Sequence, residues 1–162
     1  MEVLWKDHPF GEAETMAPAL ELTENVEMYL KYIFLLSEQN HGTAKTGEIS
    51  HYLKVAPSSV TEMLERLQKD KLVRYAKYQG ASLTKKGKDV ALKILRRHCT
   101  MEYFLVHLGV PEGKYHDEAC EMEHVLSDDT TRRLQKLIDW PSTCPECYDL
   151  DRLHCKHLAG KR

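Results

Sequence analysis

The sequence predicts a mainly helical protein with an N-terminal winged helix-turn-helix and a second helical region after it. Apolar residues recur at helical spacing through most of residues 23–138, and a pair of short strand patterns interrupts them once. The chain has 162 residues, of which 42% are hydrophobic, so it can form one sizeable core or two small units that share one. We expect four parts: a flexible arm over 1–20, the winged helix over 21–90, further helices over 91–140 and a Cys-rich tail over 141–162.

The first helix is predicted to begin after Thr23, which is a typical N-cap residue, and to end at the turn over 40–42. Two shorter helices follow, over 46–53 and over 57–69, with a tight corner over 54–56. The second of them repeats apolar residues at i, i+3, i+4 and i+7, namely Val60, Met63, Leu64 and Leu67. This spacing buries one face and leaves a polar N-terminal end exposed, which is typical of a helix-turn-helix.

The wing is predicted from two short strand patterns on either side of the break at Gln79-Gly80. Thr84 can then cap a long helix that reaches about Leu108. We expect one more helix, which runs without interruption from about Lys114 to Ile138.

Charge is distributed unevenly along the chain although the net charge is only -2. From Lys54 to Arg97 there are twelve Lys or Arg and four acids, whereas Glu112 to Asp129 holds seven acids and one Lys. One part can therefore face phosphates while another holds cations.

A helix in the major groove brings small polar side chains to base edges, while nearby basic residues neutralise phosphates. The residues that we expect to contact DNA are Pro57, Ser58, Ser59, Thr61 and Glu62 on the helix, with Lys54, Arg74 and Lys77 beside it. Helix-turn-helix patterns also occur in domains that only dock proteins, and runs of charge are often solvated surfaces. The wing together with the local basic excess favours DNA.

The N-terminus lacks the basic and apolar segments of a signal peptide, and no apolar run is long enough to span a bilayer. We therefore expect a cytoplasmic protein. The five cysteines are then expected to be thiols or metal ligands, because the cytosol keeps thiols reduced.

The segment 116–124 holds the most specific pattern in the chain. At about 100° per residue, His116, Cys120, Glu123 and His124 share a helical stripe beside an apolar face. His98 and Glu102 are an i, i+4 pair on the preceding helix and can add ligands. Imidazole and carboxylate suit divalent first-row ions, and a thiolate shifts the preference toward iron, cobalt, nickel or zinc over manganese.

Residues 116–128 read HDEACEMEHVLSD, Met28 lies in EMYLKYI, and His98 lies in RRHCTMEYF. With these motifs, the chain resembles the diphtheria-toxin-repressor and manganese-transport-regulator family of metal-dependent regulators over about 22–138. The resemblance implies a homodimer with a winged helix and a helical metal-binding and dimerisation region. It also implies that metal orders the first helix, that the dimer binds a palindromic operator, and that metal-uptake genes are repressed.

The resemblance further implies two metal sites. The primary ligands would be Met28, Cys120, Glu123 and His124, and the ancillary ligands would be His98, Glu102 and His116. Iron-type members have Met and Cys where manganese-type members have two acids, so we predict Fe²⁺ as the activating ion. The segment 55–61 instead resembles the manganese-type branch, which keeps Mn²⁺ as the alternative.

Full-length iron-type members continue into a third, barrel-like domain, whereas this chain has a short Cys-rich tail in that place. Cys144, Cys147, Cys155 and His157 have a spacing that can close around one Zn²⁺ ion. A flexible tail whose cysteines bind nothing fits the same residues equally well.

Rival functions of other classes remain open on the sequence alone. A site of His, Glu and Cys with an open position could activate water in a metalloenzyme, although the chain lacks a zincin signature and we predict no enzyme. A metal-independent thiol sensor could use Cys99, Cys120 or the tail cysteines.

Overall fold

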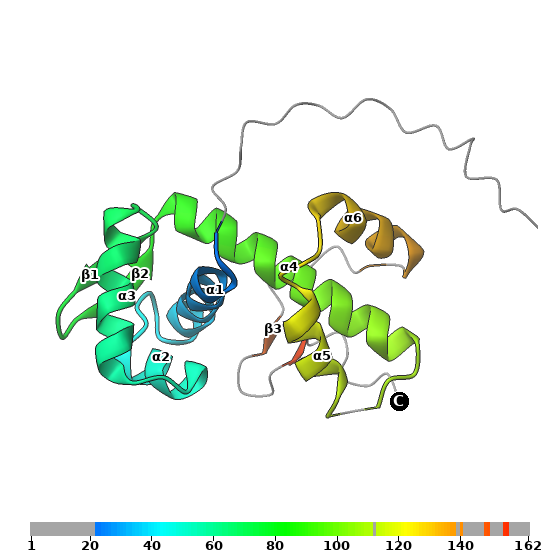
Figure 1. The fold of residues 1–162 in the computed structure, drawn as a ribbon, viewed down its shortest axis with the longest axis horizontal. Helices are drawn as coiled ribbons and strands as arrows, with labels where there is room; N and C mark the ends of the chain where they lie inside the picture. Colours follow the sequence, from blue (N-terminus) through cyan, green and yellow to red (C-terminus); the bar gives the residue numbers. More distant parts are fainter. Residues whose placement is uncertain (1–21, 112, 139, 141–147, 150–153, 156–162) are drawn as a thin grey trace, which may run out of the picture.

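The computed structural model describes residues 22–111, 113–138, 140, 148–149 and 154–155. In this part of the chain a winged helix at one end is joined by one long helix to a smaller helical region (Figure 1). None of the described helices is both long and apolar enough to cross a membrane.

Helix α1 (Glu24–Gln39) is the central helix of the core. It begins where the backbone N–H of Val26 donates to the Thr23 hydroxyl at 3.4 Å, as the sequence predicted. Nine of its residues are buried, and Leu30 and Ile33 are fully so. An apolar helix of this kind is stable only when other elements cover it on several sides.

Helices α2 (Thr46–Leu53) and α3 (Pro57–Lys69) form the predicted helix-turn-helix. The corner between them is made possible by Lys54, which adopts the left-handed conformation with φ 54°. Pro57 is in the first turn of α3, where its missing N–H removes no helical hydrogen bond. Val60, Leu64 and Leu67 are fully buried, which stabilises the helix by roughly 1.5–3 kcal/mol per side chain.

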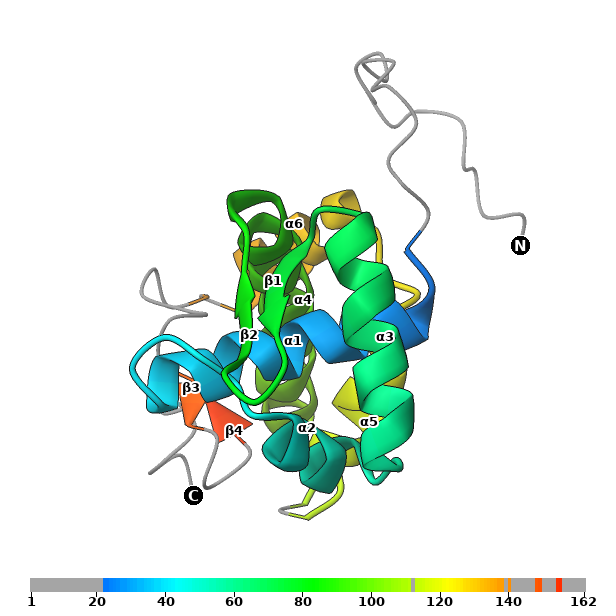
Figure 2. The same ribbon diagram turned by 90° about the vertical axis from the view of Figure 1, so that its left-hand side faces the viewer.

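The wing consists of strands β1 (Val73–Ala76) and β2 (Gly80–Leu83). They pair antiparallel, with Val73 opposite Leu83 and Ala76 opposite Gly80. Ala44, which precedes α2, adds one antiparallel bridge to Ala81 and connects the wing to the helix-turn-helix. Figure 2 shows α3 and the wing side by side on the same end of the molecule.

Helix α4 (Lys85–His107) begins as predicted at Thr84, whose hydroxyl accepts from the backbone N–H of Gly87 at 3.1 Å. Its first turns pack against the wing and α1, and its later turns pack against α5 and α6. The boundary that we expected at residue 90 thus falls inside one continuous helix. The two halves of the chain share this helix as their common support.

The single helix expected over 114–138 is wrong, because the structure divides it. Helix α5 (Tyr115–Met122) ends at Glu123, and helix α6 (Asp128–Leu137) begins after Ser127. The Ser127 hydroxyl accepts from the backbone N–H of Thr130 at 3.1 Å, and two acids occupy the first turn of α6. These are signals of a helix start, and they outweigh the continuing helical period.

A short antiparallel pair, β3 (Tyr148–Asp149) with β4 (His154–Cys155), completes the described part. β4 lies close to α4. The predicted zinc ligands Cys144, Cys147 and His157 lie outside the described residues, and Cys155 is placed by its backbone alone. The zinc site therefore stays a prediction.

The contact between Gly87 of α4 and Leu72, which precedes β1, generates a stability prediction. A Cβ on the buried Gly87 would collide with the carbonyl oxygen of Leu72. We expect Gly87→Ala to destabilise the protein by about 1–3 kcal/mol, because the backbone must shift to relieve the overlap. Urea unfolding followed by circular dichroism measures this change.

Gly47→Ala in α2 is the matched control, because a Cβ there meets nothing within 4 Å. It should stabilise the protein by about 0.5–1 kcal/mol through the better helix propensity of Ala. Equal effects of the two substitutions would show that the contact between Gly87 and Leu72 does not limit the packing of α4.

Candidate metal centre and nucleic-acid interface

The N-terminal end of α3 presents the residues that the sequence nominated for contact with DNA bases. Pro57, Ser58, Ser59 and Glu62 are exposed, and none of their side chains packs into the core. Thr61 is half-buried, and its hydroxyl donates to the Pro57 carbonyl at 3.1 Å, which holds the first turn together. This end of the helix is therefore free to enter a groove.

The predicted phosphate contacts lie on both sides of α3. Lys54 is exposed at the corner before the helix, Arg74 is exposed on β1, and Lys77 is exposed at the tip of the wing. Next to Lys77, Tyr78 is 89% exposed and its backbone is in the left-handed region, with φ 69°. The ammonium of Lys77 lies 5.4 Å from the Tyr78 ring, so the wing tip presents an aromatic side chain together with a cation.

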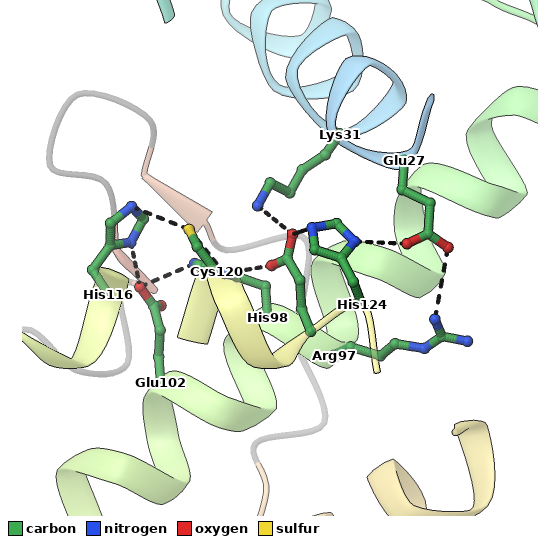
Figure 3. Close-up of polar contacts among 9 residues, drawn as sticks. Glu27, Lys31, Arg97, His98, Glu102, His116, Cys120 and His124 are labelled. Carbon is green, nitrogen blue, oxygen red and sulfur yellow. Dashed lines mark hydrogen bonds and ion pairs between the residues drawn. The ribbon is translucent and has the colours of Figure 1, made fainter. Parts of the chain in front are cut away.

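The candidate metal centre lies between α1, α4 and α5 with the residues that follow α5 (Figure 3). Helix α4 contributes His98 and Glu102, which are one turn apart and fully buried. Helix α5 and the residues that follow it contribute His116, Cys120, Glu123 and His124, and α1 contributes Glu27 and Lys31. The eight residues come from three elements, so the centre exists only in the folded chain.

One half of the centre is built around the Cys120 thiol. Its Sγ lies 3.8 Å from Nδ1 of His98 and 3.7 Å from Nε2 of His116. The other nitrogen of His116, Nδ1, lies 2.9 Å from the Glu102 carboxylate, and Nε2 of His98 lies 3.1 Å from the same oxygen. Glu102 therefore orients both imidazole rings toward the sulfur.

The other half is built around the Glu123 carboxylate. Its Oε2 lies 2.6 Å from Nδ1 of His98, so His98 belongs to both halves. Its Oε1 accepts a 2.6 Å hydrogen bond from the Lys31 ammonium and lies 3.3 Å from Nε2 of His124. Glu123 caps the C-terminus of α5, and the break before α6 lets His124 follow it into the same centre.

His124 is oriented by a chain of charged groups that reaches α6. Its Nδ1 lies 2.7 Å from the Glu27 carboxylate of α1. Glu27 in turn lies 3.8 Å from Arg97, and Arg97 donates to Asp128 at 2.8 Å. The remaining ring nitrogen of His124, Nε2, is buried and has no hydrogen-bond partner within the described residues.

The protons in the centre are redistributed by these contacts. Burial alone would raise the pKa of the Cys120 thiol, but hydrogen bonds from His116 and His98 lower this pKa to about 6. Burial alone would lower the pKa of His116, and its contacts with Cys120 and Glu102 raise it to about 9. At neutral pH the thiolate is therefore paired with an imidazolium.

The carboxylates follow the same rule. Burial would raise the pKa of both carboxylates, yet hydrogen bonds from His116 and His98 hold the pKa of Glu102 below its usual range. The hydrogen bond from His98 and the charge of Lys31 do the same for the pKa of Glu123. Burial would likewise lower the pKa of Lys31, and the neighbouring Glu123 charge raises it. The centre thus alternates positive and negative groups.

The donors that are present fit a divalent transition ion. The ligand atoms of His98, His116 and Cys120 all lie within 4.8 Å of one another. The two sulfur–nitrogen distances, 3.7 and 3.8 Å, are close to the roughly 3.6 Å edge of a tetrahedron with bonds near 2.3 Å to sulfur and 2.1 Å to nitrogen. Nε2 of His124 and the Glu123 carboxylate, which lie 3.3 Å apart, add further nitrogen and oxygen donors.

The structure brings together predicted ligands that the resemblance assigned to two separate sets. It brings Cys120 together with His98 and His116, which were expected in the ancillary site. His98 joins them to Glu123 and His124, so the two sets form one continuous centre. Met28 is half-buried on α1 and packs against the core, and its role as a ligand stays a prediction.

Sequence reasoning missed the α1 side chains that enter the centre, Glu27 and Lys31, and the second-layer pair of Arg97 with Asp128. A signal for Lys31 existed, because it is the only charged residue in the apolar run from Met28 to Leu36. A charged residue on a helix that is apolar around it needs a buried partner. Nothing in the local pattern identified Glu123, 92 residues later, as that partner.

Two family models match the chain in consecutive order. Residues 21–81 match the N-terminal DNA-binding domain of iron-dependent repressors, and residues 84–149 match the metal-binding and dimerisation domain. The boundary between the two matches coincides with the start of α4.

Named relatives agree with these matches. An uncharacterised helix-turn-helix-type regulator of Methanocaldococcus jannaschii is 40% identical over 70% of this chain and 92% of its own length. The helix-turn-helix-type regulator MntR of Bacillus pumilus is 38% identical over 73% of this chain and 81% of its own length. The solved structure of the manganese regulator SloR superposes with a TM-score of 0.64 at 37% identity over 76% of this chain.

The chain spans 58% of the SloR structure, so the match covers the winged helix and the helical region and not the whole of that protein. Within this span, the exposed end of α3, the buried donor cluster and the relatives all indicate the same kind of protein. The chain belongs to the iron-dependent repressor family, whose members are metal-dependent, DNA-binding transcriptional regulators and not enzymes.

Proposed function

We propose that this protein is a repressor of metal-uptake genes that binds a palindromic operator as a homodimer when ferrous iron occupies the centre. The DNA-binding and dimerisation domains support the two assembly steps. The acidic stretch of the chain contributes to the metal centre, and the exposed basic residues lie beside α3 and on the wing.

The observation that carries the choice of iron is the position of Cys120. Its sulfur is enclosed by His98 and His116, and its pKa of about 6 makes it a thiolate at neutral pH. A thiolate is a soft donor that favours iron, cobalt, nickel and zinc over manganese. The bound ion would supply a positive charge that holds thiolate, imidazole and carboxylate donors together.

The switch follows from where the donors come from. Helix α1 packs on α2 and α4, and it also sends side chains into the centre. The ion binds more tightly when α1 lies where the donors are assembled than when α1 lies elsewhere. Binding of the ion therefore shifts the population of molecules toward the assembled arrangement. Because α2 leads directly into α3, this arrangement also sets the orientation of the reading helix.

Manganese response is the second candidate, and the names of the relatives favour it. MntR and the manganese regulator SloR are both 37–38% identical to this chain. Oxygen and nitrogen donors of Glu102, Glu123 and the histidines suit Mn²⁺ if Cys120 does not take part. The two candidates therefore differ in the role of one sulfur atom.

Anaerobic fluorescence anisotropy distinguishes them. The probe is a labelled palindromic duplex selected from a random library by the metal-loaded protein, titrated at buffered free Fe²⁺ or Mn²⁺. We expect binding at lower free Fe²⁺ than Mn²⁺, and reversal by chelator. Replacing the soft donor by a hard one in Cys120→Asp should reduce the preference for Fe²⁺ by roughly ten-fold or more.

Tighter activation of the unaltered protein by Mn²⁺ would overturn the proposal of iron. Binding that responds to oxidation in the presence of chelator, and not to either metal, would instead favour a thiol sensor.

The wing is tested with the same duplex. Lys77→Ala should weaken binding about equally for all sequences and reduce the salt slope of log Kd by about 1, because one phosphate contact is lost. Lys136→Ala, an exposed lysine on α6, is the control and should leave both unchanged. A loss that depends on operator sequence would show that the wing tip reads bases.

Alkylation measures the ligand role of Cys120 directly. In chelator, iodoacetamide should modify Cys120 at neutral pH, and the rate should fall as the pH decreases through about 6, the pKa of this thiol. Stoichiometric Fe²⁺ or Co²⁺ should protect it. Cys99, which is buried, serves as the internal control and should stay unmodified in the folded protein.

A further inference from the structure

Lys31 is the one basic side chain of α1 and it is buried at the metal centre. Only 3% of its side chain is exposed, and its Nζ lies 2.6 Å from Oε1 of Glu123, which is fully buried. The residue occupies an otherwise apolar stretch of the helix that forms the middle of the core. A buried ammonium is stable only when its charge is balanced, and Glu123 balances it.

Glu27, the acid of α1 nearest to Lys31 in sequence, does not compete for this ammonium. Glu27 lies one turn earlier, but its carboxylate is occupied by His124 at 2.7 Å and by Arg97 at 3.8 Å. Among the carboxylates of the described residues, Lys31 therefore pairs with Glu123.

The oxygen of Glu123 that Lys31 contacts also faces Nε2 of His124. Oε1 of Glu123 lies 3.3 Å from Nε2 of His124, which has no hydrogen-bond partner among the described residues. A cation that enters between Glu123 and His124 in this arrangement would contact this oxygen. It would then be within a few ångströms of the ammonium.

We propose that Lys31 is a built-in competitor for divalent ions, which holds the Glu123 carboxylate until an ion displaces its ammonium and thereby sets the metal concentration at which the protein responds. This inference rests on the proposed function of the centre as a metal switch. It gives Lys31 of α1 a role as a competitor of the ion and not as a ligand.

The competition is electrostatic, and this gives it a distinctive signature. A single positive charge repels every divalent ion alike, whereas the Cys120 thiolate distinguishes soft from hard ions. Removing the Lys31 charge should therefore tighten the binding of all divalent ions by a similar factor, with no change in their order. Removing the thiolate should change the order.

The same contact connects the centre to the reading head. Lys31 is the residue through which α1 contacts Glu123, and α1 packs directly on α2. When an ion binds the Glu123 carboxylate, α1 loses the contact between Lys31 and Glu123. The contact of Glu27 with His124 can persist. The affinity of the ion and the position of α1 are thereby linked.

The test is a Co²⁺ titration of the purified full chain without DNA, followed by the visible absorption of the protein-bound ion, with Mn²⁺ and Zn²⁺ measured by competition. Lys31→Met removes the charge and keeps an apolar stem, and Lys31→Gln keeps a hydrogen-bond donor without charge. Lys88→Met is the matched control, because Lys88 is 52% exposed and its ion pair with Glu38 at 3.6 Å lies on the surface.

We expect Lys31→Met to bind all three ions at least roughly ten-fold more tightly than the unaltered protein, with Lys31→Gln in between and Lys88→Met unchanged. Metal-free Lys31→Met should unfold at a lower temperature, because Glu123 loses its balancing charge, and the ion should raise its Tm by more than it does in the unaltered protein. If Lys31→Met does not fold without metal, Lys31→Gln carries the same comparison.

Unchanged or weaker affinity in both Lys31 variants, with normal binding by the unaltered chain, would overturn the inference and leave the metal switch intact. A tightening confined to one ion would also overturn it, because a charge effect cannot select among divalent ions. Failure of the unaltered chain and of both variants to bind any of the three ions would overturn the metal switch and this inference together.

Discussion

The buried carboxylate of Glu123 is the group on which the arrangement of α1, α4 and α5 depends. It contacts His98 of α4, His124 of the loop after α5 and Lys31 of α1. Leaving such a carboxylate unpaired in the core would cost several kcal/mol, so the three elements must meet where it lies. The candidate metal centre is therefore also a structural junction.

Under the proposed function, the charged groups of this junction allow it to respond to an ion. An apolar seam of the same size would be more stable and would not respond to ions. The chain instead buries His98, Glu102 and Glu123 completely and satisfies them with one another. Replacement of the internal cations and protons by a divalent ion then changes the energy of the whole junction without new side chains.

Communication with DNA depends on two helices that belong to both halves of the molecule. Helix α4 starts beside the wing and carries two residues of the centre further along its length, and α1 packs on α2 while it sends Glu27 and Lys31 to the same place (Figures 1 and 3). Under the proposed function, a change at the centre would reach the helix-turn-helix through these two helices. The close contact of Gly87 with Leu72 limits how far α4 can move against the wing.

The sequence by itself determined the elements that local chemistry controls: the caps at Thr23 and Thr84, the helix-turn-helix around Pro57, and the wing. It also placed His116 and Cys120 one turn apart on a helix, whereas Glu123 and His124 lie at and beyond the end of that helix. It did not predict the break before Ser127, since a continuing helical period concealed a capping signal. Only the tertiary structure decided that Cys120 lies with His98 and His116, and that Lys31 pairs with Glu123. Such partners are far apart along the chain, and a buried charge is matched by packing in three dimensions, which no spacing within one helix records.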